Sequence, residues 1–212
     1  MISQFQQFVH HPDGGISVDG YPHIKLDMIQ EQGRAQGEAI ERELGLPVYY
    51  EEWEALAKPQ GLSGRMVRFV LADESVTRLS GKPRLQPKKI TLPPASVCHL
   101  EFGHRGFVVG VVSAFFLGDT EHREDLTHIG LEVPGFVEGD CIIAQAQLFA
   151  SSLADKAWEA IERGIFTHVC PLLLRSDTEP LGSGRLVEVS LTTGDYPGCP
   201  GARVLKRWEA YS

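Results

Sequence analysis

The most regular pattern in this 212-residue chain is an alternation of apolar and polar positions in its C-terminal two thirds. Within 141–149, Ile142 and every second residue after it are apolar, while Gln145 and Gln147 fall on the other face. This period of two is typical of a strand with one buried side. The stretch 107–116 is almost continuously apolar, which predicts a strand covered on both faces. Further strands are predicted at 66–71, 97–102, 129–133, 165–174 and 186–192.

One helix is clearly marked between the strands predicted at 141–149 and 165–174. Ser152 is expected to cap its N terminus, with Asp155 three residues later as a variant of the capping box, and Gly164 is expected to end it. The inward stripe comprises Leu153, Ala157, Trp158 and Ile161. After a turn rich in Gly and Pro, 204–208 is predicted to be a last short strand or helix. Strands, one good helix and more strands indicate a sheet-dominated α+β domain with few helices.

The first 62 residues differ from the rest and are interpreted as an N-terminal extension of a domain that spans 63–212. Residues 10–24 have the Gly and Pro content of a loop. Residues 26–44 are loosely helical, with Gly45 as the stop, and 48–56 are acidic and aromatic. The extension either packs on the body or awaits a partner.

Charge and composition narrow the classes of function. The formal net charge is -8, which argues against non-specific binding of nucleic acid, because that binding depends on clustered Lys and Arg. No apolar run approaches the roughly 20 residues needed to span a bilayer. The first ten residues lack the basic flank and apolar core of a signal peptide. A cytosolic protein is therefore expected, with its four cysteines as free thiols.

Four stretches, taken in order, resemble the prohead (capsid maturation) protease family of tailed bacteriophages. They are F-V-L-A-D-E-S-V at 69–76, the strand and loop at 97–110, the helix–Gly–strand unit at 153–170, and L-V-E-V-S-L-T at 186–192. The resemblance covers roughly 65–208. It implies the fold shared with herpesvirus assembly proteases, a herpesvirus-protease-like β-barrel.

The resemblance also implies a catalytic site. Cys170 stands where the family carries its nucleophilic serine, His104 matches the family's catalytic histidine, and Glu188 matches its acidic third member. A cysteine is a competent nucleophile when a neighbouring group favours the thiolate. Pro171 follows it and lacks the backbone N–H that an oxyanion hole would use. His168 lies two residues before Cys170, on the same face of the strand, and is a candidate substitute base.

The implied function is cleavage of scaffolding and capsid proteins during phage assembly. The protein would act in the cytoplasm of the bacterial host and inside the procapsid, without a cofactor, and as a homodimer or higher oligomer. The competing interpretation is an inactive protease-like assembly protein, suggested by the cysteine, by Pro171 and by the extension.

A metal-binding module is the third and weakest hypothesis. Its ligands would come from Cys98, His99 and His104, or from His122 and His128 near Glu121 and Asp125. These residue types suit zinc, but their spacings match no familiar site, so no metal is expected.

Overall fold

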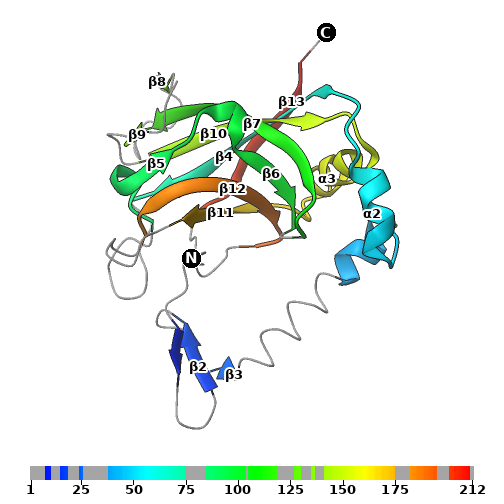
Figure 1. Cartoon of the computed structure of the whole chain (residues 1–212), viewed down its shortest axis with the longest axis horizontal. Coiled ribbons are helices and arrows are strands. Elements are labelled where there is room, and N and C mark those ends of the chain that lie inside the picture. Colours follow the sequence, from blue (N-terminus) through cyan, green and yellow to red (C-terminus); the bar gives the residue numbers. More distant parts are fainter. Residues whose placement is uncertain are drawn as a thin grey trace.

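The alternating stretch 141–149 becomes a central strand, β10 (Cys141–Phe149), of a curled mixed sheet (Figure 1). The computed structural model describes residues 8–10, 15–18, 24–25, 38–74, 85–103, 105–118, 127–129, 135–136, 141–174, 182–194 and 201–210. In these residues the large sheet has ten strands, and its main path runs β13-β4-β10-β7-β6-β12-β5-β9, with β11 on β12 and β8 on β7. The sheet-dominated α+β class predicted from the sequence is confirmed.

The remaining bounds are as follows. The strands are β1 (Phe8–His10), β2 (Gly15–Val18), β3 (Ile24–Lys25), β4 (Leu62–Asp73), β5 (Ile90–Leu92), β6 (His99–Phe102), β7 (Val108–Gly118), β8 (Thr127–Ile129), β9 (Gly135–Phe136), β11 (His168–Leu174), β12 (Gly184–Thr192) and β13 (Val204–Glu209). The helices are α2 (Tyr50–Ala57) and α3 (Ser152–Glu162), with 3-10 turns η1 (Pro87–Lys89) and η2 (Ala95–Val97).

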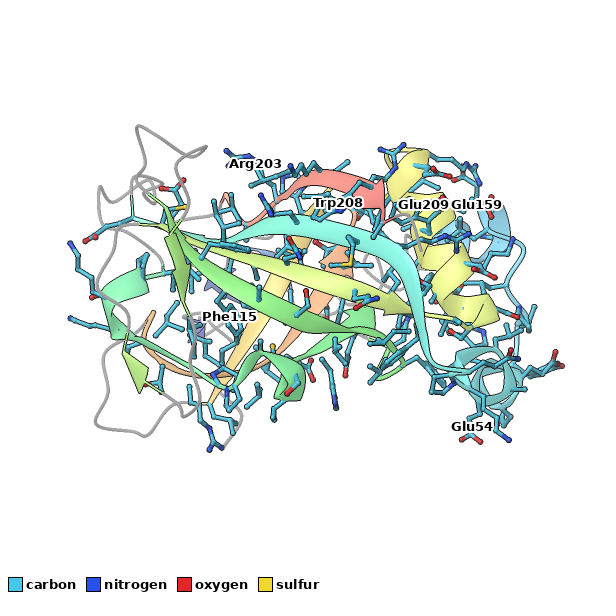
Figure 2. All side chains as sticks on the ribbon, turned by 90° about the horizontal axis from the view of Figure 1, so that it is seen from above. Glu54, Phe115, Glu159, Arg203, Trp208 and Glu209 are labelled. Atoms are coloured by element: carbon cyan, nitrogen blue, oxygen red, sulfur yellow. The ribbon has the colours of Figure 1, made fainter. Side chains whose placement is uncertain are left out.

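The main core lies on the inner side of the curled sheet. Ile142 and its alternate neighbours on β10 pack there with Phe69 of β4 and Phe115 of β7, all nearly inaccessible to solvent. In Figure 2, Phe115 lies within the curl, whereas Trp208 lies beside β13 and β4. Ile143 points the other way and joins Val70 in a smaller apolar cluster on the outer side. The alternation in the sequence therefore separates the two faces of β10.

The curl brings β11 toward the beginning of β13. Val169 N donates to Ala202 O at 3.0 Å, and Val204 N donates to Thr167 O at 2.9 Å. A single bridge joins His168 to Arg203, but the sheet is not closed into a barrel. The herpesvirus-protease-like arrangement stays a prediction.

The helix α3 begins one residue earlier than its sequence signals suggested. Ser151, rather than Ser152, is the N-cap, and its Oγ accepts a hydrogen bond from Ala154 N at 3.2 Å. Ser152 is exposed in the first turn of the helix. The prediction was wrong because two adjacent serines offer the same cap chemistry, and only the extended backbone of Ser151 selects between them. At the other end, Gly164 follows the helix with φ of 71°.

The described part of the N-terminal extension packs on the sheet domain. Residues 38–43 are helical, and Gly45 follows with φ of 66°, which suits the predicted stop. The acidic, aromatic stretch forms α2, which lies beside α3 at one end of the sheet (Figure 1). Trp53 is fully buried, its ring 5.5 Å from Phe102 and 5.5 Å from Phe107. Residues 26–37 lie outside the described residues.

Several strand boundaries differ from the predictions. Residues 10–24 were interpreted as a loop, yet β2 lies within them and β1 and β3 overlap their two ends, in a three-stranded antiparallel sheet. Pro12, Gly14, Gly20 and Pro22 fall between these strands in sequence. The strand expected from 97 begins at His99, because 95–97 form a 3-10 turn. The strand expected from 165 begins at His168. Among the described residues, no helix is long and apolar enough to cross a membrane.

Candidate active site

The predicted catalytic residues that the structure describes lie on two neighbouring strands, with Cys170 and His168 on β11 and Glu188 on β12, and β6 pairs with β12 on its other side. The register pairs Cys170 with Ser190 and Leu172 with Glu188 across β11 and β12. It then pairs Ser190 with Glu101 on β6. Because directly paired residues present their side chains on the same face of a sheet, Cys170, Ser190 and Glu101 form one row across the strands.

The opposite face of these strands belongs to the core. Val169 and Leu173 of β11, and Val189 and Leu191 of β12, are completely buried in the main cluster. Since side chains alternate along a strand, Cys170 and Ser190 lie on the opposite face of these strands from Val169 and Leu191. Cys170 is nevertheless buried and counts among the residues of the main cluster. It keeps 9% of its surface accessible, whereas Cys98 and Cys141, the other two cysteines that the structure describes, keep none.

Ser190 is an unusual neighbour for a thiol. Its side chain is completely buried, and its Oγ has no hydrogen-bond partner among the described residues. A buried hydroxyl without a partner costs about 1–3 kcal/mol, so such a group calls for a physical reason. Because Ser190 pairs directly with Cys170 across β11 and β12, its hydroxyl is a hydrogen-bond donor beside the thiol residue.

Glu188 lies diagonally from Cys170, one residue pair further along the two strands, and pairs with His99 on β6. Its carboxylate acts on the thiol of Cys98. Burial, and then the negative charge of Glu188, raise the pKa of Cys98 to about 12. Both causes disfavour a thiolate, so Cys98 stays protonated at neutral pH and is inert as a nucleophile.

His168 is oriented by its neighbour in sequence. Thr167 Oγ1 donates to Thr193 O at 3.2 Å and lies 2.8 Å from His168 Nδ1. A hydroxyl has one proton, so Thr167 donates either to Thr193 O, with Nδ1 as the donor to Thr167, or to Nδ1 itself. The first arrangement leaves the lone pair of the imidazole on Nε2, where a general base could use it. No sequence pattern indicated this contact of Thr167.

His104 lies outside the described residues, so its distance from Cys170 is untested. The residues on either side of it are described. Arg105 N donates to Phe102 O at 3.1 Å, and the Arg105 guanidinium pairs with Glu41 at 2.6 Å. Gly103 has φ of 56°, a conformation that glycine adopts readily. The chain next to His104 is thus held to the N-terminal helical segment 38–43.

The metal-binding hypothesis gains nothing from the part of the chain that the structure describes, which contains no group of three residues able to hold a metal ion. Cys98 and His99 are described, but His104, Glu121, His122 and Asp125 are not, and neither is the side chain of His128.

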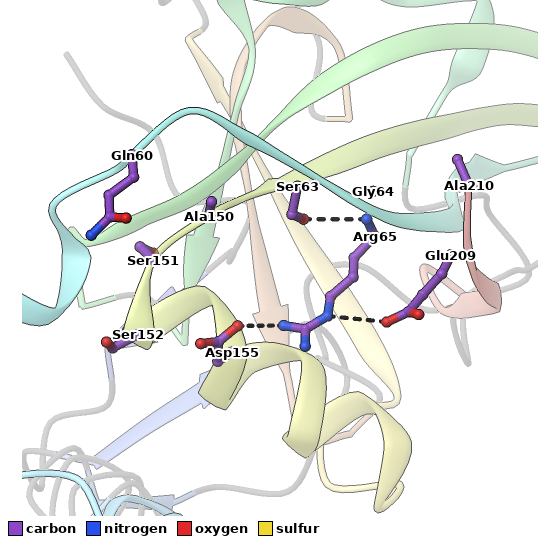
Figure 3. Close-up of a pocket in the computed structure, with 10 residues that line it drawn as sticks. All are labelled: Gln60, Ser63, Gly64, Arg65, Ala150, Ser151, Ser152, Asp155, Glu209 and Ala210. Carbon is purple, nitrogen blue, oxygen red and sulfur yellow. Dashed lines mark hydrogen bonds and ion pairs between the residues drawn. The ribbon is translucent and has the colours of Figure 1, made fainter. Parts of the chain in front are cut away.

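A pocket of about 540 Å³ opens elsewhere, at the N terminus of α3 (Figure 3). Arg65 crosses it and forms ion pairs with Asp155 and, at 3.4 Å, with Glu209. Ser63 Oγ accepts a hydrogen bond from Arg65 N at 3.2 Å. These polar groups satisfy one another, and no residue of the predicted catalytic set lines the pocket. The pocket lies between β4, the N terminus of α3 and the end of β13.

Comparison with protein-family models, curated proteins and solved structures found no match to this chain.

Proposed function

We propose that this chain is a peptidase of the prohead protease type, with a herpesvirus-protease-like sheet and Cys170 as its nucleophile. The observation that carries the proposal is that Cys170 and Glu188 share one face of the neighbouring strands β11 and β12. The two residues are 18 positions apart in the sequence, and they were predicted to act together only because their motifs resemble those of the family. Their diagonal placement corresponds to the ~7–8 Å expected between such neighbours, a span that one imidazole could bridge.

The proposed chemistry is acyl transfer through a thioester. The imidazole of His104 takes the thiol proton, and the Cys170 sulfur attacks the peptide carbonyl carbon. A C–S bond forms, the C–N bond breaks, and the imidazolium gives its proton to the departing amine. Water then attacks the thioester, forming a C–O bond and releasing the sulfur, and the water's proton returns the site to its starting state.

Two neighbours support ionisation of Cys170 in this scheme. The Ser190 hydroxyl, which lacks an acceptor among the described residues, would gain one in the thiolate. Glu188 would orient the imidazole and stabilise its charged form. His168 is the substitute base, and Thr167 Oγ1, which lies 2.8 Å from its Nδ1, would orient the ring.

The proposed substrates are scaffolding and capsid proteins, and the proposed place of action is the bacterial cytoplasm and the procapsid interior. A homodimer or higher oligomer belongs to the same proposal. The formal charge of -8 suits protein substrates better than nucleic acid.

Co-expression with capsid and scaffolding proteins of a tailed phage, the proposed substrates, followed by intact-mass analysis, tests the proposal. We expect defined cleavage products with the wild type, none with Cys170→Ala, and full cleavage with Cys141→Ala as the buried-thiol control. His104→Ala and His168→Ala, compared side by side, identify the base. Cleavage that is unchanged in Cys170→Ala would remove the thiol from the mechanism.

An inactive assembly protein on the same fold is the second candidate, and specific observations favour it. Glu101 and Glu188 place two carboxylates on the face of Cys170, and negative charge opposes a thiolate. Pro171 supplies no N–H for an oxyanion. On this alternative, the wild type produces no cleavage products, yet deletion of the chain still blocks formation of capsids.

A further inference from the structure

Two arginines on β4, three residues apart, have opposite surroundings. Arg65 pairs with two carboxylates, Asp155 and Glu209. Arg68 has no carboxylate partner among the described residues. Its only protein acceptor there is Gln145 Oε1, which its Nη2 reaches at 2.8 Å, and its Nε is buried with no partner. A guanidinium has five N–H donors, so most of its hydrogen-bonding capacity is unused by the described protein groups.

The neighbouring strand β13 sharpens this contrast. The residue of β13 that pairs with Arg65 is Glu209, an acid, whereas the residue that pairs with Arg68 is Lys206, another cation. Like charges directly opposite each other on a sheet are destabilising. Lys206 is exposed and forms no ion pair with a described residue. The two cations therefore create a local excess of positive charge in a chain whose formal charge is -8.

Aromatic rings hold the guanidinium in place. The Arg68 guanidinium carbon lies 4.8 Å from the centre of the Phe116 ring and 5.4 Å from that of Trp208. Lys206 Nζ lies 5.2 Å from the same Trp208 ring, on the outer side of the sheet (Figure 2 labels Trp208). Burial lowers the pKa of the Arg68 guanidinium. The site is thus pre-ordered, cationic and flanked by apolar surface.

We infer that Arg68, Lys206 and Trp208 form a docking site for an acidic segment of a partner protein, in which a carboxylate binds the guanidinium and an adjacent apolar side chain packs on the indole. Charge complementarity selects the carboxylate, because planar guanidinium groups bind carboxylates in a bidentate manner. The aromatic rings select a peptide over a free ion, because they offer apolar contact beside the charge. This inference does not depend on catalysis at Cys170, which lies on β11.

The probe is an acetylated, amidated pentapeptide in which two glutamates flank a leucine, and the control peptide carries glutamine in their place. Tryptophan fluorescence reports on binding, because Trp53 and Trp158 are buried and Trp208 is partly exposed. We expect the glutamate peptide to change the emission in a saturable manner and the glutamine peptide to have no effect. Free acetate at equal carboxylate concentration should bind at least tenfold more weakly, because it lacks the apolar contact.

Matched variants locate the site. Arg68→Gln should weaken peptide binding about 10- to 100-fold, the loss expected for a charge-assisted hydrogen bond. Arg65→Gln removes the same charge from the same strand and should leave binding unchanged, because Arg65 already has its carboxylates. Lys206→Gln is a second test at an exposed position where folding is not at risk, and we expect a few-fold loss.

Far-ultraviolet circular dichroism checks that each variant is folded. The inference would be overturned if Arg68→Gln and Lys206→Gln both bound the peptide as tightly as the wild type does. It would also be overturned if the protein bound a single-stranded oligonucleotide in preference to the peptide. The absence of saturable binding to the wild type at millimolar peptide would overturn it too.

Discussion

At the scale of the residue, burial and charge give the described thiols different chemistry. Cys98 is completely buried beside Glu188, and its pKa is raised to about 12. Cys170 is buried too but keeps a small accessible surface. The sequence motif made Cys170 the predicted nucleophile, which stays a prediction. The motif could not show that Ser190 lies opposite, because pairing of β11 with β12 is a property of the folded sheet.

The raised pKa of Cys98 predicts a pH-dependent stability. A thiol in the unfolded chain ionises near pH 8.5, so between about pH 8.5 and 12 only the unfolded state loses this proton. The free energy of unfolding should therefore fall as the pH rises through that window. Urea unfolding at pH 8 and pH 10 should show a loss for the wild type that exceeds the loss for Cys98→Ala by about 2 kcal/mol. Equal losses in the two proteins would contradict the assignment.

At the scale of the element, capping and close packing set the limits of α3 and of the central strands. The period-two pattern predicted β10 with its observed bounds, because one buried face leaves a strong signal in the sequence. The start of α3 was missed by one residue, because adjacent serines carry identical side chains and the difference lies in the backbone. The pairing of β12 with β6 in parallel had no local signal at all.

The cap assignment is tested by two neighbouring alanine variants. Ser151→Ala removes the acceptor for Ala154 N and should lower the free energy of unfolding by about 1 kcal/mol. Ser152→Ala, the control at an exposed position in the first turn, should change it by less than about 0.5 kcal/mol. Chemical denaturation measures both, and the reverse order would restore Ser152 as the cap.

Gly110 reports on the close approach of β7 to β10. A Cβ at Gly110 would lie 2.5 Å from Gln147 O, a backbone atom that cannot move without disturbing the ladder. We expect Gly110→Ala to destabilise the protein by about 1–3 kcal/mol, as overpacking does. Gly194 has open space around it, so Gly194→Ala is the control. A thermal melt in which the two variants behave alike would show that the strands separate easily there.

At the scale of the whole molecule, the N-terminal extension and the sheet domain share one core. Leu44, Leu46 and Trp53 belong to the same buried cluster as the strands. The sequence indicated a boundary near residue 62 because composition changes there, but composition does not reveal that Trp53 packs between Phe102 and Phe107. Such a contact joins residues about 50 positions apart by number, which no local pattern encodes.

This shared core predicts that the extension stabilises the domain. Trp53→Ala should cost about 3–5 kcal/mol, because it removes a fully buried ring and its Nε1 bond to Pro47 O. Glu54→Ala, next to it on the exposed side of α2, should cost less than about 0.5 kcal/mol. Denaturant unfolding compares the two variants. A mild effect of Trp53→Ala would mean that the extension is only loosely attached.

The most direct test of the central claim is the rate at which iodoacetamide alkylates each cysteine between pH 5 and 9, resolved by peptide mass spectrometry. If Cys170 is the nucleophile, its peptide should be modified first, with an apparent pKa below the ordinary value of about 8.5. That pKa should rise in whichever of His104→Ala and His168→Ala removes the base. Cys98 and Cys141 should stay unmodified. Alkylation of Cys170 as slow as that of Cys98 at every pH would contradict the account.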